Sequence, residues 1–205
     1  DDIGWAVSDV DAGAVGLGGF EHRRFLNDFY SGRFPSSFAR GDLFQENPAT
    51  GDARISGSAA ALCGIEDAVD RGDEHALELG IRRPVLLYSV VFAYGGIPLI
   101  YTGDALALRN DVGYLDDPEL AADNRWMHRP PMDWAVAARR GDQSTIEGRA
   151  FGWIQRLGRA RKDLLALQTG GEFDVVTVDN PHVLAWRRRH SRSGISAPRL
   201  DAALL

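Results

Sequence analysis

A helix followed by two glycines and a short apolar run is the feature that most limits what this chain can fold into. Apolar residues recur at helical spacing over about residues 84–93, and Gly95-Gly96 ends this predicted helix. The run at 97–101 has no polar alternation and is closed by a polar tip at 102–104, a pattern typical of a parallel strand covered on both faces. These features form half of a βα repeat, so we predict an α/β fold.

The rest of the chain contains both helical and strand-like patterns. Helical spacing predicts helices at 21–30 and 144–168, whereas period-two patterns predict strands at 173–178 and 182–187. Turn residues between short runs predict a hairpin-like module within 36–58. We expect loops in three other segments: 3–20, with at most a short weak helix, the charged stretch 66–74, and the long polar stretch 109–142, whose length favours a functional role.

Composition narrows the possible partners. The chain of 205 residues has a net charge of −6 and is 44% hydrophobic, which suits a globular chain and disfavours nucleic acid or an anionic membrane as partner. The run Arg187-Arg188-Arg189 is therefore predicted to be an exposed strand end. No apolar stretch is long enough to span a bilayer, so we expect a cytoplasmic or secreted protein and not a membrane protein. One cysteine, Cys63, and five scattered histidines offer no ligand spacing, so we predict no metal and no cofactor.

The chain begins with two adjacent carboxylates, Asp1 and Asp2. On local sequence alone they are best explained as a solvated chain terminus. Neighbouring residues at the end of a strand point to opposite sides, so only one of the two can face a given cavity. Neither an initiator methionine nor a signal-peptide pattern is present here, and we expect the chain to begin inside a longer protein.

Several motifs occur along the chain in an order characteristic of one enzyme family. They are Asp1-Asp2-Ile3-Gly4-Trp5, Arg33-Phe34, Ser37-Phe38-Ala39-Arg40-Gly41, residues 44–61, Leu87-Tyr88-Ser89, residues 96–101 and Arg125-Trp126-Met127-His128-Arg129-Pro130. From residue 1 to about residue 189 the chain resembles the amylosucrases, a branch of the α-amylase superfamily with a (β/α)8 barrel. Such a set is far more specific than one short motif. One departure is Gly103-Asp104-Ala105, where the superfamily commonly has a glutamate in third place, which changes the hydrogen bonding expected after the last strand.

The resemblance implies a retaining glucosyltransferase that takes glucose from sucrose, releases fructose and extends an α-1,4-glucan. Asp1 matches the aspartate after barrel strand seven that binds sugar hydroxyls and stabilises the oxocarbenium-like transition state. Asp2 and Arg54 match an ion pair that closes the pocket behind the glucosyl ring, where bidentate geometry makes a rigid wall. Arg125 matches an arginine that lines the sugar subsites. Without the motifs around them, both arginines are explained as ordinary loop charges.

The resemblance also implies an incomplete barrel. Residues 1–70 correspond to the end of strand seven and an inserted subdomain, and residues 71–170 to helix seven, strand eight, a long loop and helix eight. Residues 171–205 correspond to the start of a truncated β-rich C-terminal domain. In the family, the nucleophile and the general acid lie on strands four and five, upstream of this sequence. We expect the chain to need the N-terminal part of the barrel, and to be inactive and aggregation-prone alone.

The sequence leaves other functions open. Sucrose hydrolases resemble amylosucrases closely and differ in whether water or a glucan accepts the glucosyl unit. Trehalose synthase is more distant, because the pair Asp2–Arg54 favours sucrose. A carbohydrate-binding remnant without turnover would keep Asp1, Asp2, Arg54 and Arg125.

Overall fold

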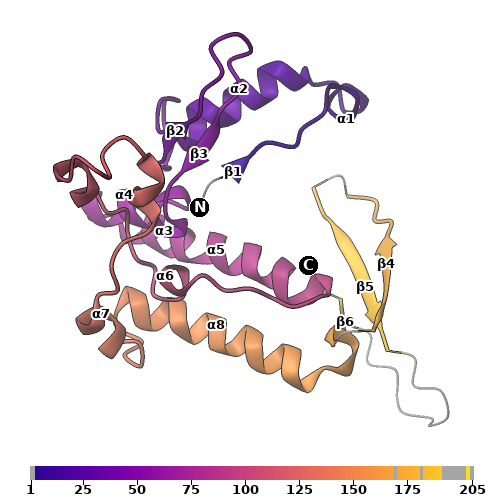
Figure 1. The fold of residues 1–205 in the computed structure, drawn as a ribbon. Helices are drawn as coiled ribbons and strands as arrows, with labels where there is room; N and C mark the ends of the chain where they lie inside the picture. Colours follow the sequence, from indigo (N-terminus) through magenta and orange to yellow (C-terminus); the bar gives the residue numbers. More distant parts are fainter. Residues whose placement is uncertain (1–2, 169, 181, 191–201, 204–205) are drawn as a thin grey trace.

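The computed structural model describes residues 3–168, 170–180, 182–190 and 202–203, and it contains two small sheets joined by helices (Figure 1). Both sheets are antiparallel, with β3 at the centre of the first and β5 at the centre of the second. In chain order the elements are β1 (Ile3–Gly4), α1 (Asp9–Ala14), α2 (Gly19–Tyr30), β2 (Asp42–Phe44), β3 (Arg54–Ser56), α3 (Ala59–Leu62), α4 (Ile65–Arg71), α5 (Glu74–Tyr94), α6 (Thr102–Ala105), η1 (Gly113–Asp116), η2 (Asn124–His128), α7 (Trp134–Ala138), α8 (Ile146–Asp163), η3 (Leu165–Leu167), β4 (Glu172–Val176), β5 (Ala185–Arg189) and β6 (Ala202–Ala203).

Two long helices form the middle of the molecule. α5 and α8 pack side by side and end near the β4–β5 hairpin, while the first sheet with α1 and α2 forms a separate lobe (Figure 1). One buried cluster packs α3 and α4 against α5 through Ala60, Ile65, Ala68, Leu77 and Ile81. A second cluster packs the hairpin and η3 against the end of α5 through Ala93, Leu167 and Trp186. The lobe is therefore anchored to the long helices through α3 and α4.

Several predicted elements are confirmed. α2 occupies the helix predicted at 21–30, and β2 and β3 form the hairpin-like module, with Leu43 opposite the fully buried Ile55. β4 and β5 are the two predicted strands, with bounds displaced by one to three residues, and they pair antiparallel. α8 ends at Asp163, earlier than predicted, and a short 3-10 turn follows it. Hydrophobic periodicity therefore located α2, α8, β4 and β5, and turn residues located the module of β2 and β3.

Two helices differ from the sequence predictions. The charged stretch 66–74, predicted to be a loop, mostly forms α4, because Ile65 and Ala68 are buried on one side while charged residues cover the other. α5 begins at Glu74, with Asp73 capping its first turn, and continues through Pro84. A proline removes one helical hydrogen bond. The helix continues past Pro84 because residues before and after the proline, including Ile81 and Phe92, are buried.

The segment 97–101, predicted to be a buried parallel strand, lies outside both sheets. Ile97 and Leu99 are 90% and 85% exposed, and exposure alternates along the segment. A strand requires a hydrogen-bonded neighbour, and none of the described strands pairs with this segment. The described strands form no parallel pair, so the (β/α)8 barrel stays a prediction.

The arginine run at the end of β5 divides between two faces of the strand. Arg187 and Arg189 donate to the carboxylate of Asp174 on β4. Arg188 is buried, and its guanidinium donates to three backbone carbonyls, those of Tyr94, Ala166 and Gln168. The prediction of an exposed strand end is therefore wrong for Arg188, because strand alternation turns it, with Trp186, toward α5.

Candidate functional site

The first sheet carries one of the predicted site residues, Arg54, at the start of β3. Arg54 is paired with Gly4 on β1 and with Phe44 on β2. Residues directly opposite in an antiparallel pair share one face of the sheet, so the side chains of Arg54 and Phe44 are neighbours. Asp1 and Asp2 lie outside the described residues. The predicted catalytic role of Asp1 and the predicted ion pair between Asp2 and Arg54 therefore stay predictions.

Arg125, the other predicted site residue, is brought to the same place by η2. Its guanidinium lies over the ring of Phe44, with 4.8 Å between the guanidinium carbon and the ring centroid. This is within the range of a cation–π contact. The two arginines come from motifs far apart in the sequence, yet both border the side chain of Phe44. The structure thus brings together both predicted site residues that it describes.

Asn124 holds η2 against the sheet. Its amide donates to the Asp42 carboxylate at 2.8 Å and to the Leu43 carbonyl at 2.7 Å. η2 is also held by the backbone amide of Asp111, which donates to the Met127 carbonyl at 2.8 Å. These bonds explain how a segment of the long polar stretch, without regular structure predicted from its sequence, keeps a fixed position beside β2.

Asp123 binds Arg125 in a bidentate ion pair. The guanidinium donates from Nε to Oδ1 at 2.8 Å and from Nη2 to Oδ2 at 2.6 Å. Asp123 also caps η2 by accepting from the Arg125 amide at 3.0 Å. The Arg125 guanidinium lowers the pKa of the Asp123 carboxyl to about 2. The pair is therefore charged on both sides throughout the usual assay range.

This ion pair predicts a defined pH dependence. The folded pKa of Asp123 lies below its unfolded value of about 4, so the unfolded chain takes up the proton first as the pH falls. The stabilisation from the pair is therefore complete above that value and is lost as the pH falls toward about 2. In a carbon-13 NMR titration, we expect the Asp123 carboxyl to stay ionised at pH ~3. Arg125→Gln should raise the midpoint, whereas Arg129→Gln should move it little.

An open hollow of about 390 Å³ lies between the ends of β1 and β3 and helix α2, and is lined by Trp5, Ala6, Val7, Ser8, Arg23, Asp52 and Ala53. Arg23 donates to the Asp52 carboxylate at 3.1 Å and to the Val7 carbonyl at 2.7 Å. The Trp5 indole donates to Asn27 at 2.8 Å. The Thr50 hydroxyl and Arg23 lower the pKa of Asp52. An aromatic edge beside a fixed charge pair suits a polyhydroxylated ligand.

Sequence reasoning missed Arg23, Asp123 and Phe44. Arg23 lies in an amphipathic helix, where a charged residue is expected on the solvent side. The available signal was proximity to matched motifs: Asp123 lies two residues before Arg125, and Phe44 starts the matched stretch 44–61. The contact of Arg125 with Phe44 depends on the tertiary position of η2, which no local pattern specifies.

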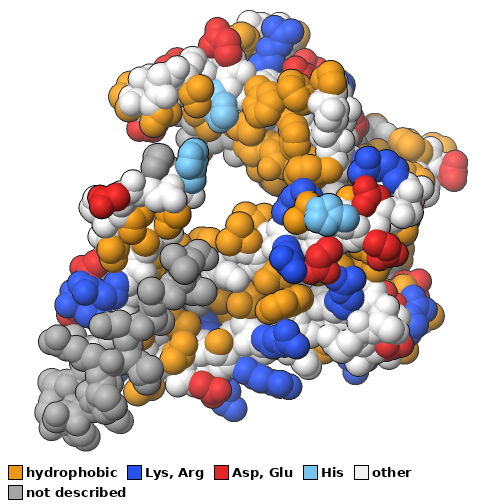
Figure 2. Space-filling model, turned by 180° about the vertical axis from the view of Figure 1, so that it is seen from behind, with side chains coloured by type: hydrophobic (Ala, Val, Ile, Leu, Met, Phe, Trp, Pro, Cys, Tyr) orange, Lys and Arg blue, Asp and Glu red, His pale blue; other side chains and the backbone are white. Residues whose placement is uncertain are grey.

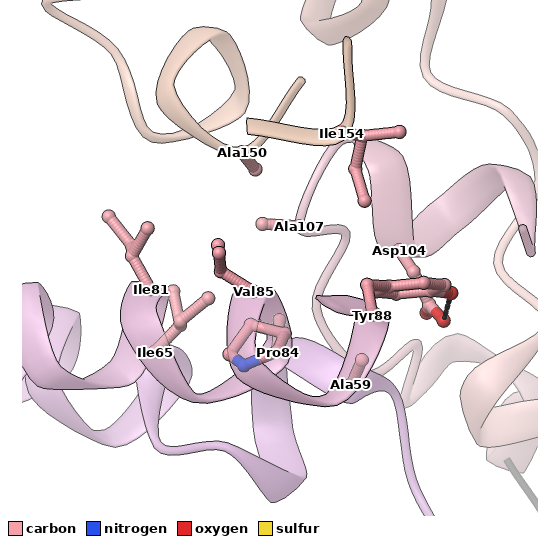
Figure 3. Close-up of a pocket in the computed structure, with 11 residues that line it drawn as sticks. Ala59, Ile65, Ile81, Pro84, Val85, Tyr88, Asp104, Ala107, Ala150 and Ile154 are labelled. Carbon is pink, nitrogen blue, oxygen red and sulfur yellow. Dashed lines mark hydrogen bonds between the residues drawn. The ribbon is translucent and has the colours of Figure 1, made fainter. Parts of the chain in front are cut away.

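A second polar pair lies deeper, between α5 and α6. The Tyr88 hydroxyl donates to the Asp104 carboxylate at 2.6 Å, at one end of a cavity of about 20 Å³ (Figure 3). Burial raises the pKa of Asp104, although the Tyr88 hydrogen bond lowers it, and burial also raises the pKa of Tyr88. Aliphatic side chains, including Ile65, Ile81 and Val85, line the rest. The cavity has room for about one water molecule and is too small for a sugar.

Asp104 belongs to the stretch in which the sequence departs from the superfamily pattern. The chain keeps this aspartate in a hydrogen bond with Tyr88, while the next residue, Ala105, has no polar side chain. The pair therefore ties α6 to α5 without any contribution from position 105.

No protein-family model matches the chain. In the part of the chain that the structure describes, no three His, Cys, Asp or Glu side chains gather as a metal site would require. Over the same residues, no helix combines the length and apolarity needed to cross a membrane. The candidate site is thus defined by its geometry: Arg54 and Arg125 at Phe44, together with the hollow that Ala53, the residue before Arg54, helps to line.

Proposed function

We propose that the chain is the C-terminal part of an amylosucrase-type enzyme, which transfers glucose from sucrose to an α-1,4-glucan with retention and releases fructose. The observation that carries the proposal is the meeting of Arg54 and Arg125 at Phe44. The family resemblance assigns Arg54 to the wall that closes the pocket behind the glucosyl ring and Arg125 to the lining of the sugar subsites, from motifs that are distant in the sequence. Planar cations beside aromatic rings are suited to a neutral, polyhydroxylated ligand, because they combine directed hydrogen bonds with flat apolar contact.

The exposed apolar surface supports the second part of the proposal, that this chain completes a barrel. Leu87, Val91 and Tyr94 follow one another at helical spacing on α5 and are 60%, 39% and 60% exposed. The segment 97–101 follows this helix along the chain and also exposes apolar side chains, those of Ile97 and Leu99. Hydrophobic side chains are likewise exposed among charged ones on the face shown in Figure 2. Apolar surface of this extent usually contacts another polypeptide. In the proposed enzyme, the contact is with the N-terminal strands and helices of the barrel.

The proposed division of labour follows from retaining chemistry. A retaining glycosidase needs a carboxylate nucleophile and a carboxylic acid on opposite sides of the scissile bond. Both would come from the upstream part of the barrel, while this chain would contribute Asp1 for the transition state and Arg54, Asp2 and Arg125 for sugar binding. Glu46, Glu66 and Glu147 match neither the nucleophile motif nor the general-acid motif of the family.

Sucrose cleavage by the chain, alone and in combination, tests the proposal. We expect no fructose release from the purified chain. Mixing or coexpression with an amylosucrase fragment that carries the nucleophile and the general acid should restore release. Fructose release by the chain alone would contradict the proposed division of labour. A stable complex that binds sucrose but never cleaves it would instead support the non-catalytic carbohydrate-binding remnant.

The acceptor is tested in the same assay by product ratios. If a glucan accepts the glucosyl unit, free glucose should be much less than fructose, and added maltooligosaccharides should be elongated. Equal amounts of glucose and fructose would identify the alternative, a sucrose hydrolase. The hollow lined by Arg23 and Asp52 is the proposed place for an acceptor sugar. Because the hollow is open to solvent, a glucan chain bound there could extend out of the site.

A further inference from the structure

The Arg125 guanidinium is held along one edge by a residue of its own short helix. Both Asp123 oxygens accept from Nε, at 2.8 and 3.1 Å, and Oδ2 also accepts from Nη2 at 2.6 Å. A bidentate carboxylate fixes the plane of a guanidinium as well as its position, because two parallel donors meet two parallel acceptors. Arg125 therefore cannot rotate freely about its last side-chain torsions.

One face of the same guanidinium is covered by Phe44, at 4.8 Å from the ring centroid. Asn124 ties η2 to the two residues of β2 that precede Phe44, through the Asp42 carboxylate and the Leu43 carbonyl. The ion pair and the aromatic ring consequently belong to one hydrogen-bonded unit. The Asp123 carboxylate along one edge and the Phe44 ring over one face together give the Arg125 guanidinium one defined orientation.

Stability alone does not account for this arrangement. The side chains of Arg125 and Asp123 are 37% and 29% exposed. Ion pairs with this much solvent access contribute little to folding, because they are screened and because ordering two side chains has an entropic cost. Fixing an arginine before its ligand arrives has a different benefit, since the ligand does not have to order it.

We infer that Asp123 and Phe44 are positioning residues, which hold the Arg125 guanidinium in the orientation needed to donate hydrogen bonds to a neutral saccharide. The inference rests on the proposed function, because it takes the ligand to be sucrose or the glucosyl unit derived from it. A guanidinium held in one plane presents its donors in fixed directions. Neither Asp123 nor Phe44 needs to contact the sugar. They act through Arg125.

Nitrogen-15 NMR of arginine Nε–H groups in the purified chain tests whether Asp123 fixes the Arg125 guanidinium. Arg125→Lys identifies the Arg125 signal. In the wild-type chain, we expect this signal to be protected from solvent exchange by Asp123. Asp123→Asn keeps an N-cap acceptor but removes the carboxylate, so the protection should be lost. Asp133→Asn is the matched control, because Asp133 also caps a helix, accepting from two backbone amides, and has no arginine partner in its hydrogen bonds.

The consequence for sugar binding is tested by turnover in the reconstituted enzyme. Asp123→Asn should raise KM for sucrose by about tenfold, the order of magnitude expected when the ligand has to order one flexible side chain. The value of kcat should stay within about twofold, because the contact is the same in the ground state and the transition state. Phe44→Leu keeps the apolar volume but removes the ring and should shift KM in the same direction. Asp133→Asn should leave KM unchanged.

The possible results separate the inference from the proposed function. An unchanged Arg125 signal in Asp123→Asn overturns the positioning role. Wild-type KM in both Asp123→Asn and Phe44→Leu, in an active enzyme, overturns the role in sugar binding. If Asp123→Asn fails to fold, Phe44→Leu decides in its place. Absence of turnover in the wild-type mixture contradicts the proposed function and therefore the saccharide role, while the NMR result still decides whether Asp123 fixes Arg125.

Discussion

Ile81→Ala is expected to lower the free energy of unfolding by about 2–5 kcal/mol. Ile81 is 1% exposed and lies at the centre of the cluster that packs α3 and α4 against α5. Truncation removes apolar contacts with Ile65 and Leu77 and adds volume to the cavity of about 20 Å³ that Ile81 already lines. The surrounding helices cannot close this space without moving α4. Urea denaturation followed by circular dichroism measures the loss.

Ile97→Ala is the matched control, because it removes the same atoms from a side chain that is 90% exposed. In the isolated chain it should change the free energy of unfolding by no more than about 0.5 kcal/mol. A loss as large as that for Ile81 would show that the segment 97–101 is covered in solution. In the reconstituted barrel, by contrast, Ile97→Ala should weaken association with the N-terminal part, since the proposed enzyme buries this side chain at that interface.

The sequence predicted best the elements whose packing faces are periodic and local. α2, α8 and the strands β4 and β5 follow hydrophobic spacing that can be counted within one window, and β2 and β3 lie in the short runs on either side of the turn residues. α4 was missed because it has only two buried positions, Ile65 and Ala68, in a charged stretch. These two positions are anchored by contacts with α5, which no window on the sequence contains.

The segment 97–101 shows the opposite case, in which a clear pattern did not produce the predicted element. Its apolar run and flanking glycines satisfy every local requirement of a buried strand. A strand, however, is completed by hydrogen bonds to neighbours that come from elsewhere in the chain or from another chain. Within the described residues no such neighbour is present, and the segment leaves Ile97 and Leu99 exposed. The apolar pattern makes segment 97–101 able to form a strand, but the strand forms only when a neighbouring strand supplies hydrogen bonds.

For the candidate site, motif resemblance selected Arg54 and Arg125, and the structure added the contacts that relate them. Phe44 joins the two arginines through the β2–β3 register and a cation–π contact. Asp123 could not be selected by spacing, because an aspartate two residues from an arginine is common and makes an ion pair only when the turn has the right geometry. In η2 the N-cap conformation supplies that geometry.

Arg188→Ala is expected to lower the free energy of unfolding by about 3 kcal/mol, because it leaves three backbone carbonyls without the charged donor that now satisfies them. Arg188 is 5% exposed and connects β5 with the end of α5 and with η3. Arg187→Ala is the matched control. Arg187 is the preceding residue on the same strand, but its side chain is 43% exposed and is paired with Asp174, so its loss should cost at most about 1 kcal/mol.

Arg188→Met separates the guanidinium from the aliphatic stem that supports it. Methionine restores much of the apolar contact beside Trp186 but donates no hydrogen bond. If the carbonyl bonds stabilise the fold, Arg188→Met should be nearly as unstable as Arg188→Ala, and hydrogen exchange should show the β4–β5 amides opening before those of α8. Wild-type stability in Arg188→Met would contradict this account. The burial of a cation beside the carboxyl end of α5 would then be explained by packing of its stem, and the helix end would need no charged donor.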